Sequence, residues 1–247
     1  MDLSSYLIYI SIGLLTGFLS GMFGIGGGSV RIPLLTLAGM PLLTAFGTNM
    51  FAIPFSSGVG AYVQKDNINW KVVRSFTIGA VLGIVLATFL VGIFSSKILA
   101  ALFFFAAILT IIGLYIKDIS PRLYESIKPT ALTALSLGFL SNFIIGLRGG
   151  SGGTLFPPVL KAMHVEMHQA IATSLFTGFF SSFAALIIYF IRGDIQLLPA
   201  FVIAFTGVVG SFLGSKLSIR TESRLLKIGL SIIVFVLACV VVQKEFF

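Results

Sequence analysis

GIGGGS at residues 24–29 and GGSGGT at residues 149–154 interrupt two long apolar segments of the chain. Each Gly costs a helix about 1 kcal/mol relative to Ala, so neither stretch favours regular helix. Unpaired backbone groups in hydrocarbon cost several kcal/mol each. Broken backbone at membrane depth is tolerated only where it is buried in protein or lines a watery cavity. The two stretches therefore predict irregular turns inside a membrane domain.

The sequence around these stretches is apolar almost throughout. Of 247 residues, 57% are hydrophobic and 10% are charged, whereas a soluble domain carries about 25% charged residues. A membrane-spanning helix needs about 20 mainly apolar residues. Eight windows meet this length or nearly do: about 3–23, 45–63, 72–94, 98–116, 131–147, 169–191, 197–215 and 225–242. We expect an all-α polytopic membrane protein with about eight full spanning helices and two short glycine-broken segments.

The chain also repeats itself. GFLSG at 17–21 matches GFLSN at 138–142, and each precedes one of the glycine stretches. Further matches follow in the same order: PLL at 33–35 with PVL at 158–160, and SKIL at 96–99 with SRLL at 223–226. An ordered series of this kind indicates a duplication. We expect a first repeat at 1–119 and a second at 120–247, forming one membrane domain.

The basic residues indicate how the repeats are oriented. If only the eight long helices cross, the basic residues divide evenly between the two sides, against the positive-inside rule. If both short segments also cross, eleven basic residues fall on one side. These eleven are Lys65, Lys71, Arg74, Lys117, Arg122, Lys128, Lys161, Lys216, Arg220, Arg224 and Lys227. Five crossing elements per half would make the repeats inverted and place both termini outside. The alternative is a pair of re-entrant hairpins in parallel repeats.

Interrupted segments at matching places in two halves point to a transporter's binding site. A short helix is expected after each glycine run, with Ser29 and Thr154 as N-caps. A helix N-terminus offers free N–H groups and a positive dipole end to an anion. Arg31 and Arg148 lie beside or inside these stretches. The planar arginine fork suits sulfonate, sulfite or carboxylate oxygens, and Arg148, which glycines surround, is the stronger candidate.

Each candidate has a plainer alternative. Either arginine could extend to the interface as a topology anchor. The glycines could serve close helix packing, as four-residue spacing indicates for Gly13, Gly17 and Gly21, for Gly79 and Gly83, and for Gly210 and Gly214. Polar residues that open the next helices could bind substrate oxygens or join helices. The candidate substrate-binding residues are Arg148, Arg31, Gly26, Gly27, Gly28, Ser29, Gly149, Gly150, Ser151, Gly152, Gly153, Thr154, Thr48, Asn49, Thr173 and Ser174.

Several functions are disfavoured by what the sequence contains. The single Cys239 cannot form an internal disulfide, and His164 and His168 lack an obvious third metal ligand. The eight acidic residues lie at termini or in expected loops, which disfavours a cation transporter or a membrane enzyme. The net charge of +8 is explained by basic loops, not by nucleic acid. We expect no cofactor and no metal.

The paired motifs resemble those of the TauE/SafE family of sulfite exporter-like permeases. The first copy runs from GFLSG at 17–21 to AFGTN at 45–49, and the second runs through ATS at 172–174. The resemblance covers essentially the whole chain, with Ser151 interrupting the second glycine run and Asn49 standing where the family more often has Ser. It implies secondary transport of sulfite, sulfoacetate or related C2 sulfonates, or of other small organic anions, across a prokaryotic inner membrane.

The leading hypothesis is therefore an anion exporter with substrate held between the repeats. An anion channel with the same site is an alternative, and a non-transporting membrane scaffold is another. The expected partners are a small anion, the lipid bilayer and a coupling ion, H⁺ or Na⁺. The apolar outer surface would permit a homodimer.

Overall fold

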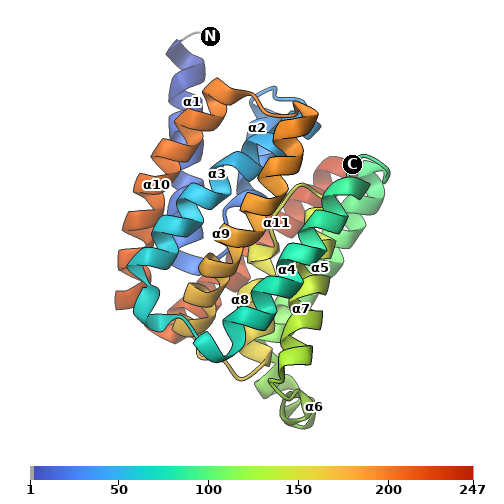
Figure 1. The fold of residues 1–247 in the computed structure, drawn as a ribbon, viewed down its shortest axis with the longest axis vertical. Coiled ribbons are helices and arrows are strands. Elements are labelled where there is room, and N and C mark those ends of the chain that lie inside the picture. The colour runs from blue at the N-terminus through green and yellow to red at the C-terminus, as the bar shows by residue number, and fades with distance from the viewer. Residues whose placement is uncertain (1–2, 247) are drawn as a thin grey trace.

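The computed structural model describes residues 3–246 and is all-α over that range (Figure 1). The long helices are α1 (Leu3–Phe23), α3 (Leu42–Val63), α4 (Trp70–Leu90), α5 (Ser96–Ile119), α7 (Ala131–Gly146), α9 (Met167–Arg192), α10 (Leu197–Arg220) and α11 (Ser223–Phe246). The short elements are α2 (Gly28–Leu37), η1 (Lys65–Asn67), α6 (Pro121–Ser126), η2 (Gly152–Thr154) and α8 (Phe156–Ala162). Each long helix corresponds to one of the eight predicted windows, and α2 and α8 follow the two glycine stretches, so the predicted fold class is confirmed.

The surface of the bundle is that of a membrane protein. Within the described residues, α1, α4, α9, α10 and α11 are long and apolar enough to cross a membrane. Large apolar side chains point outward, and Phe205 and Ile191 are 74% and 79% exposed. A water-soluble monomer rarely exposes contiguous apolar surface on this scale. The chain is a multi-pass membrane protein.

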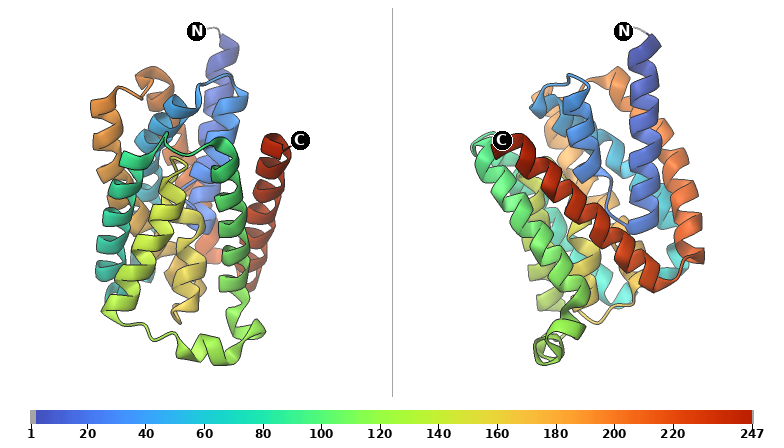
Figure 2. Two further views of the ribbon diagram at one scale, coloured as in Figure 1. Left: turned by 90° about the vertical axis from the view of Figure 1, so that its right-hand side faces the viewer. Right: turned by 180° about the vertical axis from the view of Figure 1, so that it is seen from behind.

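The two sets of helices run in opposite directions. From the N-terminus, α1 runs toward the far end, α2 returns, and α3, α4 and α5 alternate (Figures 1 and 2). The series α7 to α11 starts from the far end and alternates in the opposite sense, so both termini lie at the same end of the molecule. This is the arrangement expected of inverted repeats with five elements each. The division at residues 119 and 120 stays a prediction.

The pairing of the helices shows the same relation between the two series. The most extensive interfaces join α1 to α10 and α4 to α7, while α3 packs on α9 and α5 on α11. In each of the first two pairs, the first element of one series packs on the fourth element of the other. Exchanging the two series therefore maps the α1–α10 interface onto the α4–α7 interface, and maps the α3–α9 and α5–α11 interfaces onto themselves, as a two-fold axis in the membrane plane requires.

The glycines at four-residue spacing make these interfaces tight. A Cβ added at Gly17 would lie 2.2 Å from the carbonyl oxygen of Gly207, and one at Gly79 would lie 2.0 Å from that of Leu135. The same close approach to backbone recurs at Gly13, Gly21, Gly83, Gly210 and Gly214. The predicted packing role of these glycines is confirmed, because only hydrogen leaves room for the neighbouring backbone.

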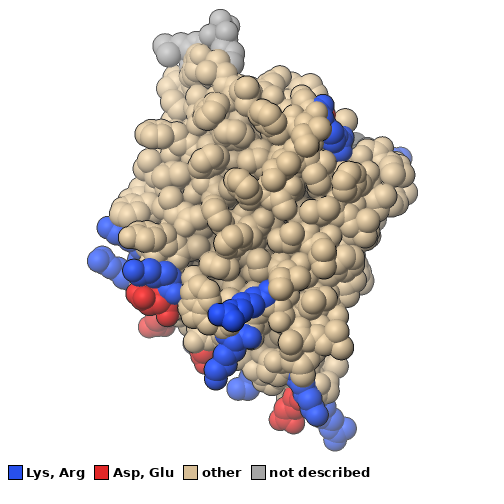
Figure 3. All heavy atoms as spheres, in the orientation of Figure 1, with Lys and Arg blue, Asp and Glu red and all other residues tan. Residues whose placement is uncertain are grey.

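Most of the basic residues visible in Figure 3 gather at the end of the molecule away from the termini. Ten of the eleven predicted to share a side lie in or beside the connections α3–α4, α5–α7 and α10–α11, and Lys161 lies in the last turn of α8. All of these positions belong to that same end. The charge distribution agrees with the arrangement in which α2 and α8 each complete a return through the bundle.

Gly17→Ala should lower the melting temperature of the purified protein in detergent, because its methyl group would meet the Gly207 carbonyl. Overpacking a tight interface costs roughly 1–3 kcal/mol. Gly207→Ala is the matched control from the opposite helix: its added Cβ would meet the Gly13 oxygen at 3.6 Å, an ordinary contact. Equal melting temperatures for the two variants would show that the α1–α10 interface is looser than described.

Candidate functional site

The two glycine stretches form turns that touch at the centre of the molecule. Gly26, Gly27 and Gly149 have φ angles of 65°, 75° and 68°, a left-handed conformation that glycine adopts without strain. A Cβ on Gly153 would lie 2.2 Å from the carbonyl carbon of Ile25. The backbones of the two turns are therefore in direct contact, and glycine is required at the point where they meet.

Reciprocal hydrogen bonds hold each turn from the opposite series. The Asn49 side chain on α3 donates through Nδ2 to the carbonyl oxygen of Gly149 at 2.9 Å. The Ser174 hydroxyl on α9 donates to the carbonyl oxygen of Gly24. In the repeat alignment Asn49 matches Ser174 and Gly24 matches Gly149, so the two bonds are equivalent. Together they pair backbone carbonyls that the broken helices leave without partners.

A third contact lies between equivalent residues. The hydroxyls of Ser29 and Thr154, which match in the repeat alignment, are 3.4 Å apart. A residue touching its own counterpart lies on the axis that relates the two series. The two turns thus touch each other at Gly153 and Ile25 and on this axis, and each is also bonded to a helix of the opposite series.

Arg31 lies in α2, shortly after the first glycine turn, and is fully buried. Its Nε donates to Thr16 Oγ1 and its Nη1 to Asn49 Oδ1, each at 3.0 Å. Among the described residues, Nη2 has no hydrogen-bond partner. Thr16 and Asn49 are both neutral, so neither balances the positive charge that the arginine brings into the interior. The corresponding position of the second series is Phe156, so the buried charge is present on one side only.

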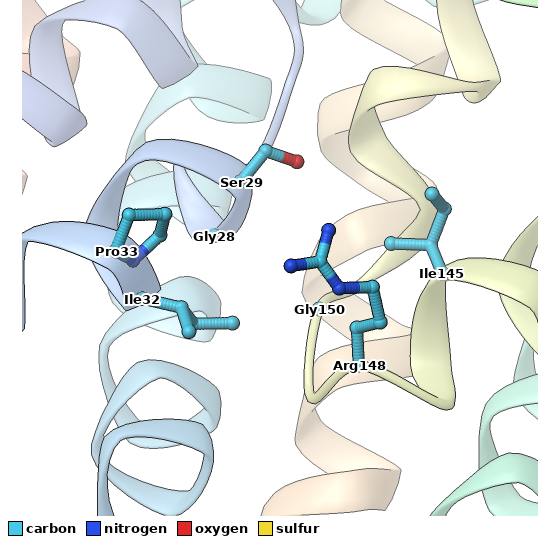
Figure 4. Close-up of a pocket in the computed structure, with 7 residues that line it drawn as sticks. All are labelled: Gly28, Ser29, Ile32, Pro33, Ile145, Arg148 and Gly150. Carbon is cyan, nitrogen blue, oxygen red and sulfur yellow. The ribbon is translucent and has the colours of Figure 1, made fainter. Parts of the chain in front are cut away.

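A small pocket opens beside the turns (Figure 4). Its walls are Gly28, Ser29, Ile32 and Pro33 of α2, together with Ile145, Arg148 and Gly150 of α7 and the second turn. The half-buried Arg148 extends its guanidinium across the gap toward α2. The space open within the pocket is about 20 Å³, which is enough for about one water molecule.

The first turn of α2 adds donors to this pocket. The helix begins at Gly28 with Gly27 as its N-cap and has no side-chain cap. The first N–H groups of a helix lack intrahelical acceptors, and the first two residues of α2, Gly28 and Ser29, line the pocket. The N-terminal end of α2 and a guanidinium group therefore border one small space.

The predicted N-caps are wrong. Ser29 lies inside the first turn of α2, and Thr154 ends η2, two residues before α8 begins at Phe156. The first turn of α8 contains Pro157 and Pro158, which have no N–H for a cap to accept. The threonine hydroxyl instead pairs with Ser29.

The polar pairs on α3 and α9 lie farther into their helices than predicted. The helices begin at Leu42 and Met167, so these four residues lie about two helical turns from the helix starts. They are Thr48, Asn49, Thr173 and Ser174. Thr173 Oγ1 accepts from the backbone N–H of Asn69 at 3.0 Å, and Thr48 is buried. None of the four is among the residues that line the pocket. The hydrogen bonds of Asn49, Thr173 and Ser174 join helices and support the turns. Among the described residues, the Thr48 hydroxyl has no hydrogen-bond partner.

Other residues were missed at the sequence level. Asn142 accepts from the Gly152 N–H and donates to the Ala80 carbonyl at 2.9 Å, which ties the second turn to α4. Ser151 pairs with Ser181 on α9 at 3.1 Å. Thr16 Oγ1 accepts the hydrogen bond from Arg31 Nε. Asn142 ends the repeated GFLS motif, which was a usable signal, whereas Thr16 and Ser181 are ordinary helical hydroxyls.

The histidines lie away from this site. His164 Nε2 is 3.0 Å from the Ile127 carbonyl oxygen, and His168 lies between the Thr221 carbonyl and the Ser223 hydroxyl. In the described part of the chain, no three His, Cys, Asp or Glu side chains are grouped as a metal would require. Both histidines have contacts that fasten loops at the basic end.

Comparison with known proteins is decisive at the family level. The profile of the family described as "Sulfite exporter TauE/SafE" matches residues 9–241. The chain belongs to this family. Its TauE/SafE relatives include a "Probable membrane transporter protein" of Haemophilus influenzae, 29% identical over 94% of this chain and 96% of the relative. Another, MJ0441 of Methanocaldococcus jannaschii, is 30% identical over 93% and 92%.

A third relative, YunE of Bacillus subtilis, is 23% identical over 98% of this chain and 99% of its own length, and it too is described as a probable membrane transporter protein. No solved structure matches the chain significantly. Family membership and the apolar helices make this protein a membrane transporter, and the described pocket lies where the two broken segments of the family motif meet.

Asn49→Ala should destabilise the protein more than Ser174→Ala, with no anion present. Removing the amide leaves both Arg31 Nη1 and the Gly149 carbonyl without their partners. Removing the hydroxyl leaves only the Gly24 carbonyl. Each buried group left unpaired costs about 1–3 kcal/mol, and a charged group costs more.

Thermal unfolding of both variants beside Ser126→Ala, an exposed hydroxyl on α6, measures the difference. A larger loss for Ser174→Ala would contradict the central role given to the Asn49 amide.

Proposed function

We propose that this TauE/SafE protein is a secondary transporter that exports a small sulfur-containing or organic anion, such as sulfite or a C2 sulfonate. The observation that carries the proposal is the position of Arg148 in the pocket between the two broken segments. Interrupted helices that meet in this way form the substrate sites of transporters built from inverted repeats.

The pocket chemistry suits an oxyanion with a short carbon chain. The guanidinium fork of Arg148 can hold two oxygens of one sulfonate or sulfite group, and the N–H groups at the start of α2 can hold a third. None of the seven lining residues is acidic. Ile32, Pro33 and Ile145 supply apolar walls that a two-carbon chain can contact.

The size of the pocket supports a transport cycle with moving parts. About 20 Å³ does not admit a sulfonate, so substrate binding requires the turns to separate. The contact between the Ser29 and Thr154 hydroxyls is a weak interaction between the two turns, since 3.4 Å is long for a hydroxyl hydrogen bond. Its opening would enlarge the pocket, and alternate opening toward each side would move the anion.

The orientation follows from the basic end. Positive residues are retained on the cytoplasmic side of membrane proteins, so this end faces the cytoplasm and both termini face outward. In a prokaryote the membrane is the plasma membrane. Coupling to H⁺ or Na⁺ would drive the cycle.

In a thermal-shift screen against sulfite, sulfate, thiosulfate, sulfoacetate, isethionate and acetate, a sulfur oxyanion or sulfonate should raise the melting temperature. A ligand that binds only the folded state stabilises it by about 2.7 kcal/mol at 100 times its Kd. Arg148→Gln should abolish that response, because a neutral amide replaces the charged fork.

Arg122→Gln is the control, because Arg122 is an exposed arginine on α6 outside the pocket. Its response to the anion should equal that of the unchanged protein. If no anion shifts a well-folded sample, the anion site is refuted and the glycine turns serve packing alone, as in a scaffold.

Alternating access has a separate test with Ser29→Cys in a Cys239→Ala background, since Cys239 is exposed. In proteoliposomes, a membrane-impermeant thiol reagent should reach residue 29 from each side in turn, and a bound anion should slow the reaction. Equal, simultaneous labelling from both sides would identify a channel and overturn the transporter mechanism.

A further inference from the structure

A second and larger cavity lies at the basic end, away from the glycine turns. It measures about 290 Å³ and lies between α5, α8 and α11, with α6 beside it. Small-molecule sites begin at roughly 300 Å³. The cavity shares no lining residue with the pocket at Arg148, so it is a separate space with room for a ligand in the described conformation.

The lining of this cavity is strongly positive. Lys117, Lys161, Arg224 and Lys227 contribute four positive charges, and Asp118 contributes one negative charge, which leaves a formal charge of +3. Tyr124 and Ser223 add hydroxyl groups. The four cations come from three separate helices, so the fold itself gathers them around one space.

Existing contacts hold part of this lining in place. Lys227 Nζ is 3.0 Å from Asp118 Oδ2 and 3.8 Å from the centre of the Tyr115 ring. One carboxylate, itself 66% exposed, offsets only one of the four cations. The remaining excess of positive charge favours a ligand with a concentrated negative charge, and a phosphate group is the common ligand of that kind at a cytoplasmic membrane surface.

The surroundings of the cavity favour a lipid over a soluble phosphate. Two apolar residues next to lining residues on α5 and α11 face outward: Ile112, beside Gly113, is 39% exposed, and Ile228, beside Lys227, is 38% exposed. The cavity wall itself includes Leu114, Ile116 and Met167. An acyl chain could therefore lie along the helices while the headgroup occupies the basic space. Basic pockets between membrane helices on the cytoplasmic side bind anionic headgroups in this way.

We propose that the cavity between α5, α8 and α11 is a phosphate site that takes the headgroup of an anionic phospholipid through Lys117, Lys161, Arg224 and Lys227. The bound lipid ties α8, which directly follows the second glycine turn, to the peripheral helices α5 and α11. The site is independent of the transported anion and does not depend on its identity.

The test is native mass spectrometry of the purified protein titrated with dioleoyl phosphatidylglycerol, with the zwitterionic dioleoyl phosphatidylcholine as the lipid comparison. The protein should retain phosphatidylglycerol selectively, and Lys161→Gln/Lys227→Gln should weaken that binding by roughly tenfold or more. Lys216→Gln is the matched control, since Lys216 is an exposed lysine at the same end on α10 and is not part of the cavity lining.

Soluble glycerol 3-phosphate and inorganic phosphate distinguish the source of the phosphate group. If the two soluble phosphates compete with phosphatidylglycerol only weakly, the ligand is the lipid. If they bind the unchanged protein as tightly as phosphatidylglycerol does, and the double variant does not bind them, the phosphate site stands and the lipid source is overturned. Equal phosphatidylglycerol binding by the double variant and Lys216→Gln would refute the site. Unliganded melting temperatures of the two variants verify that both are folded.

Discussion

The fold depends on pairing the backbone that two broken helices expose inside an apolar bundle. Asn49 and Ser174 achieve this across the axis, each donating to the leading glycine carbonyl of the other series. Because the turns must also lie against each other, Gly153 has no room for a side chain beside Ile25. The small residues, the amide and the hydroxyl are thus consequences of one constraint: irregular backbone in hydrocarbon must find its partners within the protein.

The near-symmetry of the backbone carries an asymmetric set of charges. Arg31 is buried on the first series, where the second has Phe156 packed edge-on against Phe76 at 5.1 Å. Arg148 follows α7, whereas the corresponding residue of the first series is Phe23, the last residue of α1 and part of the core. Pro157 and Pro158 remove donors from the start of α8, while α2 keeps its own. The two series share a duplicated scaffold, but Arg31 and Arg148 each have a phenylalanine at the matching position of the other series.

Much of this arrangement could be predicted from the sequence, because the dominant signals are local. Runs of about 20 apolar residues locate helices whatever their neighbours, and the glycine runs locate the breaks. The basic residues add direction, since Lys161 belongs with the other cations only if α8 crosses. The glycines at spacing of four were also correctly assigned to packing, for steric reasons that depend on helix periodicity alone.

The errors arose where tertiary contacts decide. Thr154 fits an N-cap by composition, but the following prolines leave nothing for it to cap, and its partner, Ser29, is 125 residues away. Arg31 has the same local context as a pocket residue, yet it turns beneath the helix toward Thr16. The periodicity of the sequence does not show in which direction a side chain points from an irregular turn. The supporting roles of Asn49 and Ser174 could therefore be recognised only in the assembled structure.

The pairing of α1 with α10 has a consequence for how the molecule is made. The glycine face of α1 fits the backbone of a helix that begins only at Leu197, and chains are synthesised from the N-terminus. The glycine face of α1 therefore cannot reach its partner until α10 has been synthesised. The sequence halves are consequently not independent folding units: each begins with a helix whose tightest partner belongs to the other, and assembly is completed only when the last third of the chain closes back on the first.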